Sequence, residues 1–482
     1  MDFPIHKAFK DPTERRYVVV SRTVAPRKLE MNMTEGPLLG KMILFTLPVM
    51  ASGMLQLLFN AADVMVVGKF AGDAAMAAVG CCGALINLII NLFIGLAVGV
   101  GVLAAQDIGA KRYEGVKRLV STALTASIVG GIAVGVLGFF LAEPLLVLMD
   151  TREDVLPEAV PYMRAYFCGI PGCLIYNYMA AVLRSTGDTK RPLYFLTVAG
   201  VANVALNLLM VCVFHMGAVG VGIATAVSQY VSAALILIYM SRMEGYCRIT
   251  GFAVDQSRLL RMITIGLPAG LQGCMFSLSN VLIQSNINTY ATPIVAGNTA
   301  AGNLEGFVYT AMNSVYQTAL TFIGQNVGAG KYRRIKRISL LCVGMVSVIG
   351  LTLGLGLTFF GDRLLLLYAS GENASAVIAA GMARLRVIAV CYVLCGLMDV
   401  GCGILRGMGR AIQPMIVSLL GSCAFRILWV KTVCEWFPGQ IMMLYISYPI
   451  SWIVTGGVHY FLCFYFYRRL MRKQSEAQLQ TA

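Results

Sequence analysis

Long stretches without a charged residue constrain this chain more than any other feature of its sequence. Fifty consecutive residues, 192–241, and 43 consecutive residues, 262–304, contain no Asp, Glu, Lys or Arg. A bilayer-spanning helix needs about 20 apolar residues, so each stretch can hold two crossings. Because only 13% of the residues are charged and 58% are hydrophobic, the composition excludes a soluble enzyme. Further uncharged stretches cover 74–106, 119–142, 165–183, 338–361 and 436–467.

These stretches predict an all-α polytopic membrane protein. In lipid, the backbone N–H and C=O groups must be satisfied within the protein, which leaves helices or closed barrels, and runs of this length favour helices. We expect twelve transmembrane helices, at 42–67, 75–105, 119–142, 163–183, 192–214, 218–241, 262–288, 299–324, 338–360, 384–405, 412–430 and 439–467.

The distribution of basic residues predicts the orientation of the chain. Eighteen Lys and Arg residues fall in the even-numbered loops between the predicted helices. Seven fall in the odd-numbered loops or in the first three residues of the helices that follow them, and both terminal segments are basic. Because basic loops stay in the cytoplasm, we expect both termini there. The net charge of +15 then follows from topology and requires no nucleic-acid partner.

The chain carries an internal duplication with a period of about 220 residues. Each period contains six predicted helices, an even number, so both halves enter the membrane in the same direction. We therefore expect two parallel six-helix repeats, or lobes, around a central cleft, an arrangement common among secondary transporters. The matching pairs are QDIGAKRYEGVKR (Gln106–Arg118) with QNVGAGKYRRIKR (Gln325–Arg337), LRSTGDTKRPL (Leu183–Leu193) with LRGMGRAIQPM (Leu405–Met415), and Leu47, Pro48 and Asn60 with Leu267, Pro268 and Asn280.

The duplication also sets the expected domain boundaries. We expect a disordered cytoplasmic tail at 1–36, a first lobe at 37–241, a cytoplasmic linker at 242–261, a second lobe at 262–467 and a cytoplasmic tail at 468–482. Translation from Met31 or Met33 would omit most of the first tail.

Four polar residues of the first lobe are expected to meet at one depth in the membrane. Asp63 lies near the outer end of the first helix, Asn203 and Asn207 share a face of the fifth because they are four residues apart, and Thr225 lies at a similar depth on the sixth. Desolvation favours the neutral form of a carboxyl group. We therefore interpret these residues as a site where Asp63 takes up a cation or proton, the alternative being a carboxylate that caps the helix end.

A second group of polar residues lies in the second lobe. Such stripes either line a cavity or join helices. Glu305, Tyr309, Asn313 and Gln317 recur every four residues, Asn280 and Gln284 do so on the preceding helix, and Asp399 lies near mid-membrane. We predict that these residues contact substrate, and that Glu305 and Arg426, at similar depth, form a buried ion pair.

The sequence resembles the multidrug and toxic compound extrusion (MATE) family over nearly its whole length. The resemblance rests on NAADVMVVGKFAG (Asn60–Gly72), the QDIGAKR and LRSTGDTKRP segments, and their second copies. It implies a twelve-helix antiporter that exports organic cations and other amphipathic compounds in exchange for H⁺ or Na⁺. The DinF-like branch is the closest match, since its acid on helix 1, polar pair on helix 5 and hydroxyl on helix 6 correspond to Asp63, Asn203 with Asn207, and Thr225.

The resemblance departs from the NorM-like branch in the second lobe. That branch binds Na⁺ with acids on helices 7 and 10, whereas helix 7 here has no acid and Asp399 falls about one turn later than the expected position. A coupling site in the first lobe is therefore favoured, with H⁺ and Na⁺ both possible ions.

The function expected from the sequence is a cation-coupled antiporter without a cofactor or bound metal. No nucleotide-binding loop is present, because the segment 328–331 lacks the first Gly and the Ser/Thr of a P-loop, and three histidines are too few for a His-rich metal site. Away from the ends of the spans there is one arginine against three acids, which favours cationic cargo. The protein is expected to be a monomer in a bacterial plasma (inner) membrane.

Two other classes were considered. A lipid-linked precursor flippase of the same superfamily is the alternative function. An intramembrane enzyme would need paired aspartates or a Ser/His dyad within the spans, and neither is present.

Overall fold

The described part of the chain, residues 31–149, 151–368 and 373–481 of a computed structural model, is built from long helices and contains no strand. The first repeat comprises α1 (Leu38–Phe70), α2 (Asp73–Gly109), α3 (Tyr113–Leu148), α4 (Leu156–Thr186), α5 (Lys190–Leu208) with its π-helical continuation η1 (Leu209–Val213), and α6 (Gly217–Arg242). The second comprises α7 (Gln256–Ile287), α8 (Thr292–Gly328), α9 (Tyr332–Leu365), α10 (Ala374–Gly407), α11 (Ile412–Ser418), η2 (Leu419–Ala424), α12 (Phe425–Lys431), α13 (Val433–Trp436) and α14 (Ile441–Thr481).

The twelve predicted crossings are confirmed in the described residues. Here α5 with η1 counts as one crossing, and so does the run from α11 through α13. Eleven of the twelve are long and apolar enough to cross a membrane. The remaining helix, α8, is 37 residues long but carries the polar stripe.

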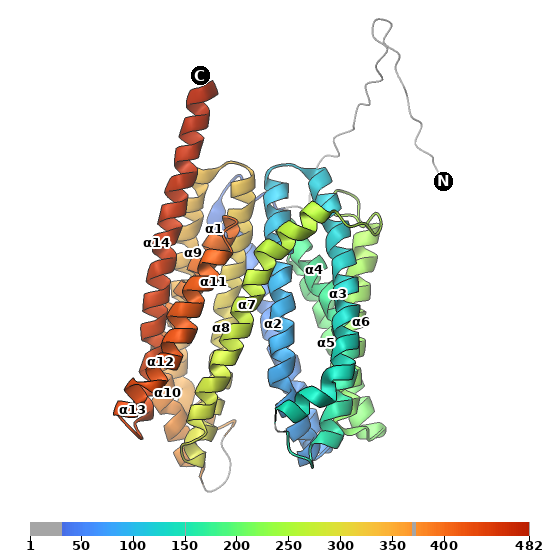
Figure 1. The fold of residues 1–482 in the computed structure, drawn as a ribbon, viewed down its shortest axis with the longest axis vertical. Helices are drawn as coiled ribbons and strands as arrows, with labels where there is room; N and C mark the ends of the chain where they lie inside the picture. Colours follow the sequence, from blue (N-terminus) through green and yellow to red (C-terminus); the bar gives the residue numbers. More distant parts are fainter. Residues whose placement is uncertain (1–30, 150, 369–372, 482) are drawn as a thin grey trace, which may run out of the picture.

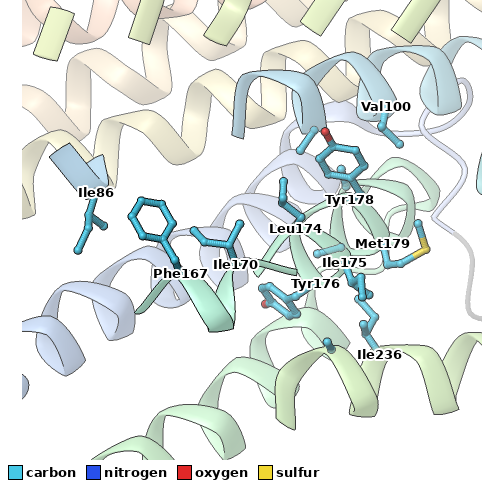
Figure 2. Close-up of a cluster of buried hydrophobic side chains, with 14 of the residues drawn as sticks. Ile86, Val100, Phe167, Ile170, Leu174, Ile175, Tyr176, Tyr178, Met179 and Ile236 are labelled. Carbon is cyan, nitrogen blue, oxygen red and sulfur yellow. The ribbon is translucent and has the colours of Figure 1, made fainter. Parts of the chain in front are cut away.

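Two groups of helices form the lobes, with α2–α6 on one side and α8–α14 on the other in Figure 1. The helix α7 runs obliquely across the front, from the first lobe at its start to the second at its end. Within the lobes, α4, α8 and α10 bury much of their length against neighbouring helices. Figure 2 shows the core around α4, where Phe167 and Leu174 lie among side chains of α2 and α6.

The two lobes meet closely where α2 crosses α7. A Cβ atom placed on Gly95 would lie 2.0 Å from the backbone nitrogen of Gly270, so the two backbones touch without intervening side chains. Small residues permit such close crossings in membranes.

The duplicated motifs clasp the lobes together at the end of the molecule where the described chain begins, at Met31, and where α14 ends. Gln106 donates from Nε2 to the carbonyl of Gly407 (3.2 Å), and its counterpart Gln325 donates to the carbonyl of Ser185 (2.7 Å). Gly109 and Gly328 approach with the same symmetry. A Cβ on Gly109 would lie 1.9 Å from the Gln325 carbonyl oxygen, and one on Gly328 1.9 Å from that of Gln106. The molecule is therefore closed at this end, and we call these contacts the clasp.

The position after each clasp glutamine differs between the copies. Asp107, which is 2% exposed, forms ion pairs with Arg112 (3.0 Å) and with Arg258 of α7. Its counterpart Asn326 donates instead to the carbonyl of Met33, at 3.2 Å. One copy thus holds the segment that enters α7, and the other holds the segment that enters α1.

Residues 31–36, which we predicted to be disordered, instead form an ordered segment that we call the strap. The Met31 amide donates to the Thr186 carbonyl of the first lobe (3.3 Å). On the second lobe, Lys331 donates to the Thr34 carbonyl (3.2 Å) and Arg334 to that of Gly36 (3.1 Å). The side chain of Met33 is fully buried. Residues 1–30, for which we predicted disorder or absence, lie outside the described residues.

Two other predicted boundaries differ from the observed helices. The helix α7 begins at Gln256, inside the predicted linker, because the Asp255 side chain accepts from the Arg258 amide at 3.1 Å and caps it. The helix α14 continues to Thr481 through the predicted tail.

Candidate functional site

The four polar residues predicted in the first lobe lie together in one connected network. Asn207 of α5 donates from Nδ2 to Asp63 of α1 and, at 3.3 Å, to the Asn203 side-chain oxygen. Asn203 in turn donates to the Thr225 hydroxyl of α6, at 3.4 Å. Both asparagines are buried, and η1 begins two residues after Asn207. π-Helical turns of this kind often accompany functional sites.

This network offers oxygen atoms and no positive charge. Asp63 forms no ion pair with Lys, Arg or His in the described chain, and the side-chain oxygen of Asn207 is buried without a hydrogen-bond donor there. A carboxylate held in this way can be neutralised by H⁺, or it can share a Na⁺ with the neighbouring amide and hydroxyl oxygens.

The second lobe contains a cavity of about 860 Å³. It is lined by residues of α7, α8, α10, α12 and α14, with Asn91 contributed by α2. The residues from the later turns of α7 and the early turns of α8 place it toward the end of the molecule opposite the clasp. Of the residues predicted to contact substrate, Asn280, Gln284, Glu305, Tyr309 and Asp399 line this cavity.

The polar stripe on α8 does not line the cavity along its whole length. Asn313 and Gln317 are absent from the lining. They lie toward the closed end, where the neighbouring Thr318 contacts Thr46 of α1 at 2.7 Å between hydroxyl oxygens. A substrate bound in this cavity would therefore not contact Asn313 or Gln317, contrary to the prediction.

The predicted ion pair between Glu305 and Arg426 is wrong. Glu305 pairs instead with Arg384 of α10, through Nε–Oε1 and Nη2–Oε2 contacts of 2.9 and 2.7 Å. Arg384 also donates to the Asn298 side-chain oxygen, at 2.6 Å. Arg426 donates from Nε to the hydroxyl of Ser451, at 2.9 Å.

Arg384 and Arg406 are the residues that the sequence analysis missed. Arg384 marked the start of the predicted tenth helix, and Arg406 was counted in a loop, but α10 extends beyond both positions, from Ala374 to Gly407. They are 7% and 6% exposed. The apolar run 374–383 is the signal that could have revealed that Arg384 lies inside a span.

Asp399 and Arg406 form a second charged group at the closed end of the cavity. Asp399 interacts with the Tyr309 hydroxyl and, through charge, with Arg406. Arg406 donates to the Tyr316 hydroxyl (2.5 Å) and to the Gln272 side-chain oxygen (2.7 Å), so it joins α10 to α8 and α7.

The buried pair predicts a large stability effect. Arg384→Met leaves the Glu305 carboxylate buried without its partner, and we expect the free energy of unfolding to fall by about 3–5 kcal/mol. Denaturant unfolding of the purified protein in detergent measures this. The matched control is Arg152→Met, which removes an exposed pair with Asp154 (2.7 Å) and should cost less than about 1 kcal/mol. Equal losses in the two variants would contradict the prediction.

Comparison with known proteins identifies the family to which this chain belongs. The MatE family model matches residues 48–209 and again 268–429, two copies that begin one repeat apart. The chain belongs to the MatE family. Membership confirms the resemblance noted in the sequence and identifies the protein as a membrane transporter rather than an enzyme.

Relatives of this MatE protein span most of its length. It is 28% identical over 411 residues to "Probable multidrug resistance protein YpnP" of Bacillus subtilis, covering 84% of this chain and 90% of the relative. It is 25% identical over 424 residues to "Probable multidrug resistance protein YoeA" of the same organism, covering 86% and 91%.

Solved structures share the fold of this MatE protein. One is described as the outward-facing conformation of a multidrug resistance MATE family transporter of the MOP superfamily. It superposes with a TM-score of 0.86 at 20% identity, covering 91% of this chain and 98% of that one. The predicted two-lobed, all-helical fold is thereby confirmed.

Proposed function

We propose that this protein exports amphipathic small molecules in exchange for H⁺ or Na⁺, and that Asp63 is the acid that takes up the coupling ion. The observation that carries the proposal is the network of Asp63, Asn207, Asn203 and Thr225, which contains a carboxylate and free oxygen atoms but no basic partner in the described chain. An acid within a membrane span is energetically costly, and such residues commonly mark ion or substrate pathways. The curated relatives named as multidrug resistance proteins support export of small molecules.

The helix α1 can transmit the state of Asp63 to the contacts between the lobes. Toward its other end, Thr46 contacts Thr318 of α8 and Phe45 lies edge-on to Phe322, with ring centroids 5.6 Å apart. Between these contacts and Asp63 lies Pro48, which removes a backbone hydrogen bond and weakens the helix locally. Neutralising Asp63 loosens its bond to α5, so that α1 repacks and alters the fit between the lobes.

The basic loops, the start of the described chain at Met31 and the end of α14 lie at the clasped end. The positive-inside rule assigns this end to the cytoplasm, and we infer that both termini lie there too. The cavity then faces outward in this structure, in a bacterial plasma or inner membrane. Transport follows by alternating access, and it requires that ion and cargo favour opposite arrangements of the lobes. The protein acts as a monomer without a cofactor.

The sequence-based argument for cationic cargo rested on a single arginine within the spans. The second lobe buries three arginines, Arg384, Arg406 and Arg426, so the charge within the spans does not favour cationic cargo. No observation favours the flippase alternative.

Transport in proteoliposomes tests the proposed function. The full chain is reconstituted with rhodamine 123, an aromatic cation, or fluorescein, a related anion, and gradients of H⁺ and of Na⁺ are imposed separately. We expect one of the gradients to drive dye movement and the matching ionophore to abolish it. Dye movement that ignores both gradients, or no movement of any amphipathic dye, would overturn the proposal.

A further inference from the structure

Arg426 is a buried guanidinium that faces the second-lobe cavity without an acidic partner. It follows η2 by two residues, is 4% exposed and lines the cavity. Its Nε donates to Ser451, but its Nη2 has no hydrogen-bond acceptor in the described residues. A buried charge without a counterion is costly, so this position calls for an anion from outside the chain.

Two other charges of the cavity, Glu305 and Arg384, are matched to each other. Arg384 donates from Nε and Nη2 to the two carboxylate oxygens of Glu305. Its third nitrogen, Nη1, donates to the side-chain oxygen of Asn298. Asp399 interacts with Arg406 and Tyr309. Glu305 therefore has its own arginine, whereas Arg426 forms no ion pair within the described residues.

Aromatic rings hold Arg426 in place and extend beside it. Its guanidinium carbon lies 4.2 Å from the ring centroid of Tyr448 and 5.6 Å from that of Trp452, positions that stabilise and orient a cation. Tyr392 lies edge-on to Trp452, with centroids 5.4 Å apart. These rings form an apolar wall next to the free nitrogen, in a cavity of about 860 Å³, a size that accommodates drug-like molecules.

We propose that the second-lobe cavity binds amphipathic aromatic anions, with the carboxylate of the ligand on Arg426 and its rings against Tyr392, Tyr448 and Trp452. A planar carboxylate matches the fork of a guanidinium, and this pairing is stronger than a neutral hydrogen bond. The inference rests on the proposed function only in treating the ligand as cargo, since binding itself needs no ion gradient.

Equilibrium binding of two dyes tests the site. Fluorescein and rhodamine 123 share a xanthene skeleton and differ in charge, and fluorescence polarisation reports their binding to the full chain in phosphatidylcholine nanodiscs. We expect the unmodified protein to bind fluorescein at least about tenfold more tightly than rhodamine 123. We expect Arg426→Gln to remove this preference by weakening fluorescein alone, and Arg426→Lys to retain part of it.

The matched control is Arg410→Gln. Arg410 also stacks on a ring, 4.8 Å from the centroid of Phe466, but lies outside the cavity, so fluorescein binding should not change. Preference of the unmodified protein for rhodamine 123 would overturn the proposal even if the Arg426 variants failed to fold. Unchanged fluorescein affinity in folded Arg426→Gln would also overturn it.

Two further measurements, binding in nanodiscs of a different lipid and gradient-driven transport of the same dyes, distinguish the anion site from lipid binding and from antiport. If phosphatidylglycerol nanodiscs abolish fluorescein binding, lipid headgroups occupy Arg426 and the aromatic-anion proposal fails. If fluorescein binds through Arg426 but neither ion gradient moves fluorescein or rhodamine 123, the proposed antiport fails while the anion site stands. If a gradient moves rhodamine 123 but fluorescein does not bind, the anion site fails and antiport stands.

Discussion

Replacing Asp63 by Asn is expected to abolish gradient-driven transport, lowering the rate by about a hundredfold, which is near the upper end of common coupling factors. Asparagine has nearly the size of aspartate and can still bond with Asn207. It carries no negative charge, so it neither takes up a proton nor attracts Na⁺. The first lobe would therefore stay in its neutral arrangement throughout the cycle.

The measurement is dye movement in proteoliposomes under each gradient, together with dye binding and thermal unfolding of the same variant. Binding and stability should stay close to those of the unmodified protein, because the second-lobe cavity is untouched. As a control, Asp154→Asn removes an exposed acid and should leave transport unchanged. Normal gradient-driven transport by Asp63→Asn would refute the role assigned to this acid.

A single methyl group at the clasp is expected to hold the lobes apart. In Gly109→Ala, the new Cβ would lie 1.9 Å from the Gln325 carbonyl oxygen, and because that atom belongs to a helix backbone, the lobes must separate. We expect transport to fall by roughly tenfold to a hundredfold as the closed arrangement loses population. Gly328→Ala should behave alike, because its contact with Gln106 is the symmetric one.

Distance measurements between spin labels at Glu114→Cys and Arg333→Cys, in a chain whose native cysteines are replaced, report this separation. We expect the distribution to shift to longer distances in both glycine variants. Gly130→Ala is the matched control, since a Cβ there meets nothing within 4 Å. If Gly109→Ala gave the same distances and rates as this control, the clasp would not govern closure.

The sequence predicted the fold well because lipid leaves few choices. Uncharged stretches longer than about 20 residues require helices, and the repeated Gln106 and Gln325 motifs identified the two lobes before any contact was known. Asp63 and the three polar residues around it were also predicted to meet, because spacing along a helix converts directly into depth and facing. Their meeting needed no knowledge of side-chain packing.

The charged residues of the second lobe were harder to place. A charge usually ends an apolar span, and a buried arginine with a partner looks the same in sequence as one in a loop. Arg384 was therefore placed at a helix end and Arg406 in a loop. Glu305 was paired with Arg426, the arginine predicted at a similar depth. Only the register of α10 against α8 distinguishes these pairings, and hydropathy carries no information about that register.

The strap was predicted to be disordered for a similar reason. Its six residues include only two large apolar side chains, Met31 and Met33. Its position is instead fixed by backbone carbonyl groups that accept hydrogen bonds from Asn326, Lys331 and Arg334. Every residue has a backbone carbonyl, whatever its side chain. Composition therefore does not reveal which segments will be held by hydrogen bonds to their carbonyl groups.

Because the strap is held by both lobes, it cannot stay fully bound when they part on this face. In the proposed alternating-access cycle, one set of its backbone bonds, to Thr186 or to the α8–α9 corner, would be released in each turnover. Cleavage by a protease between Met31 and Gly36 should therefore follow the fraction of time that the transporter spends open toward this side. The protease sensitivity of the short segment before α1 would thus report how often the transporter opens on the clasped side.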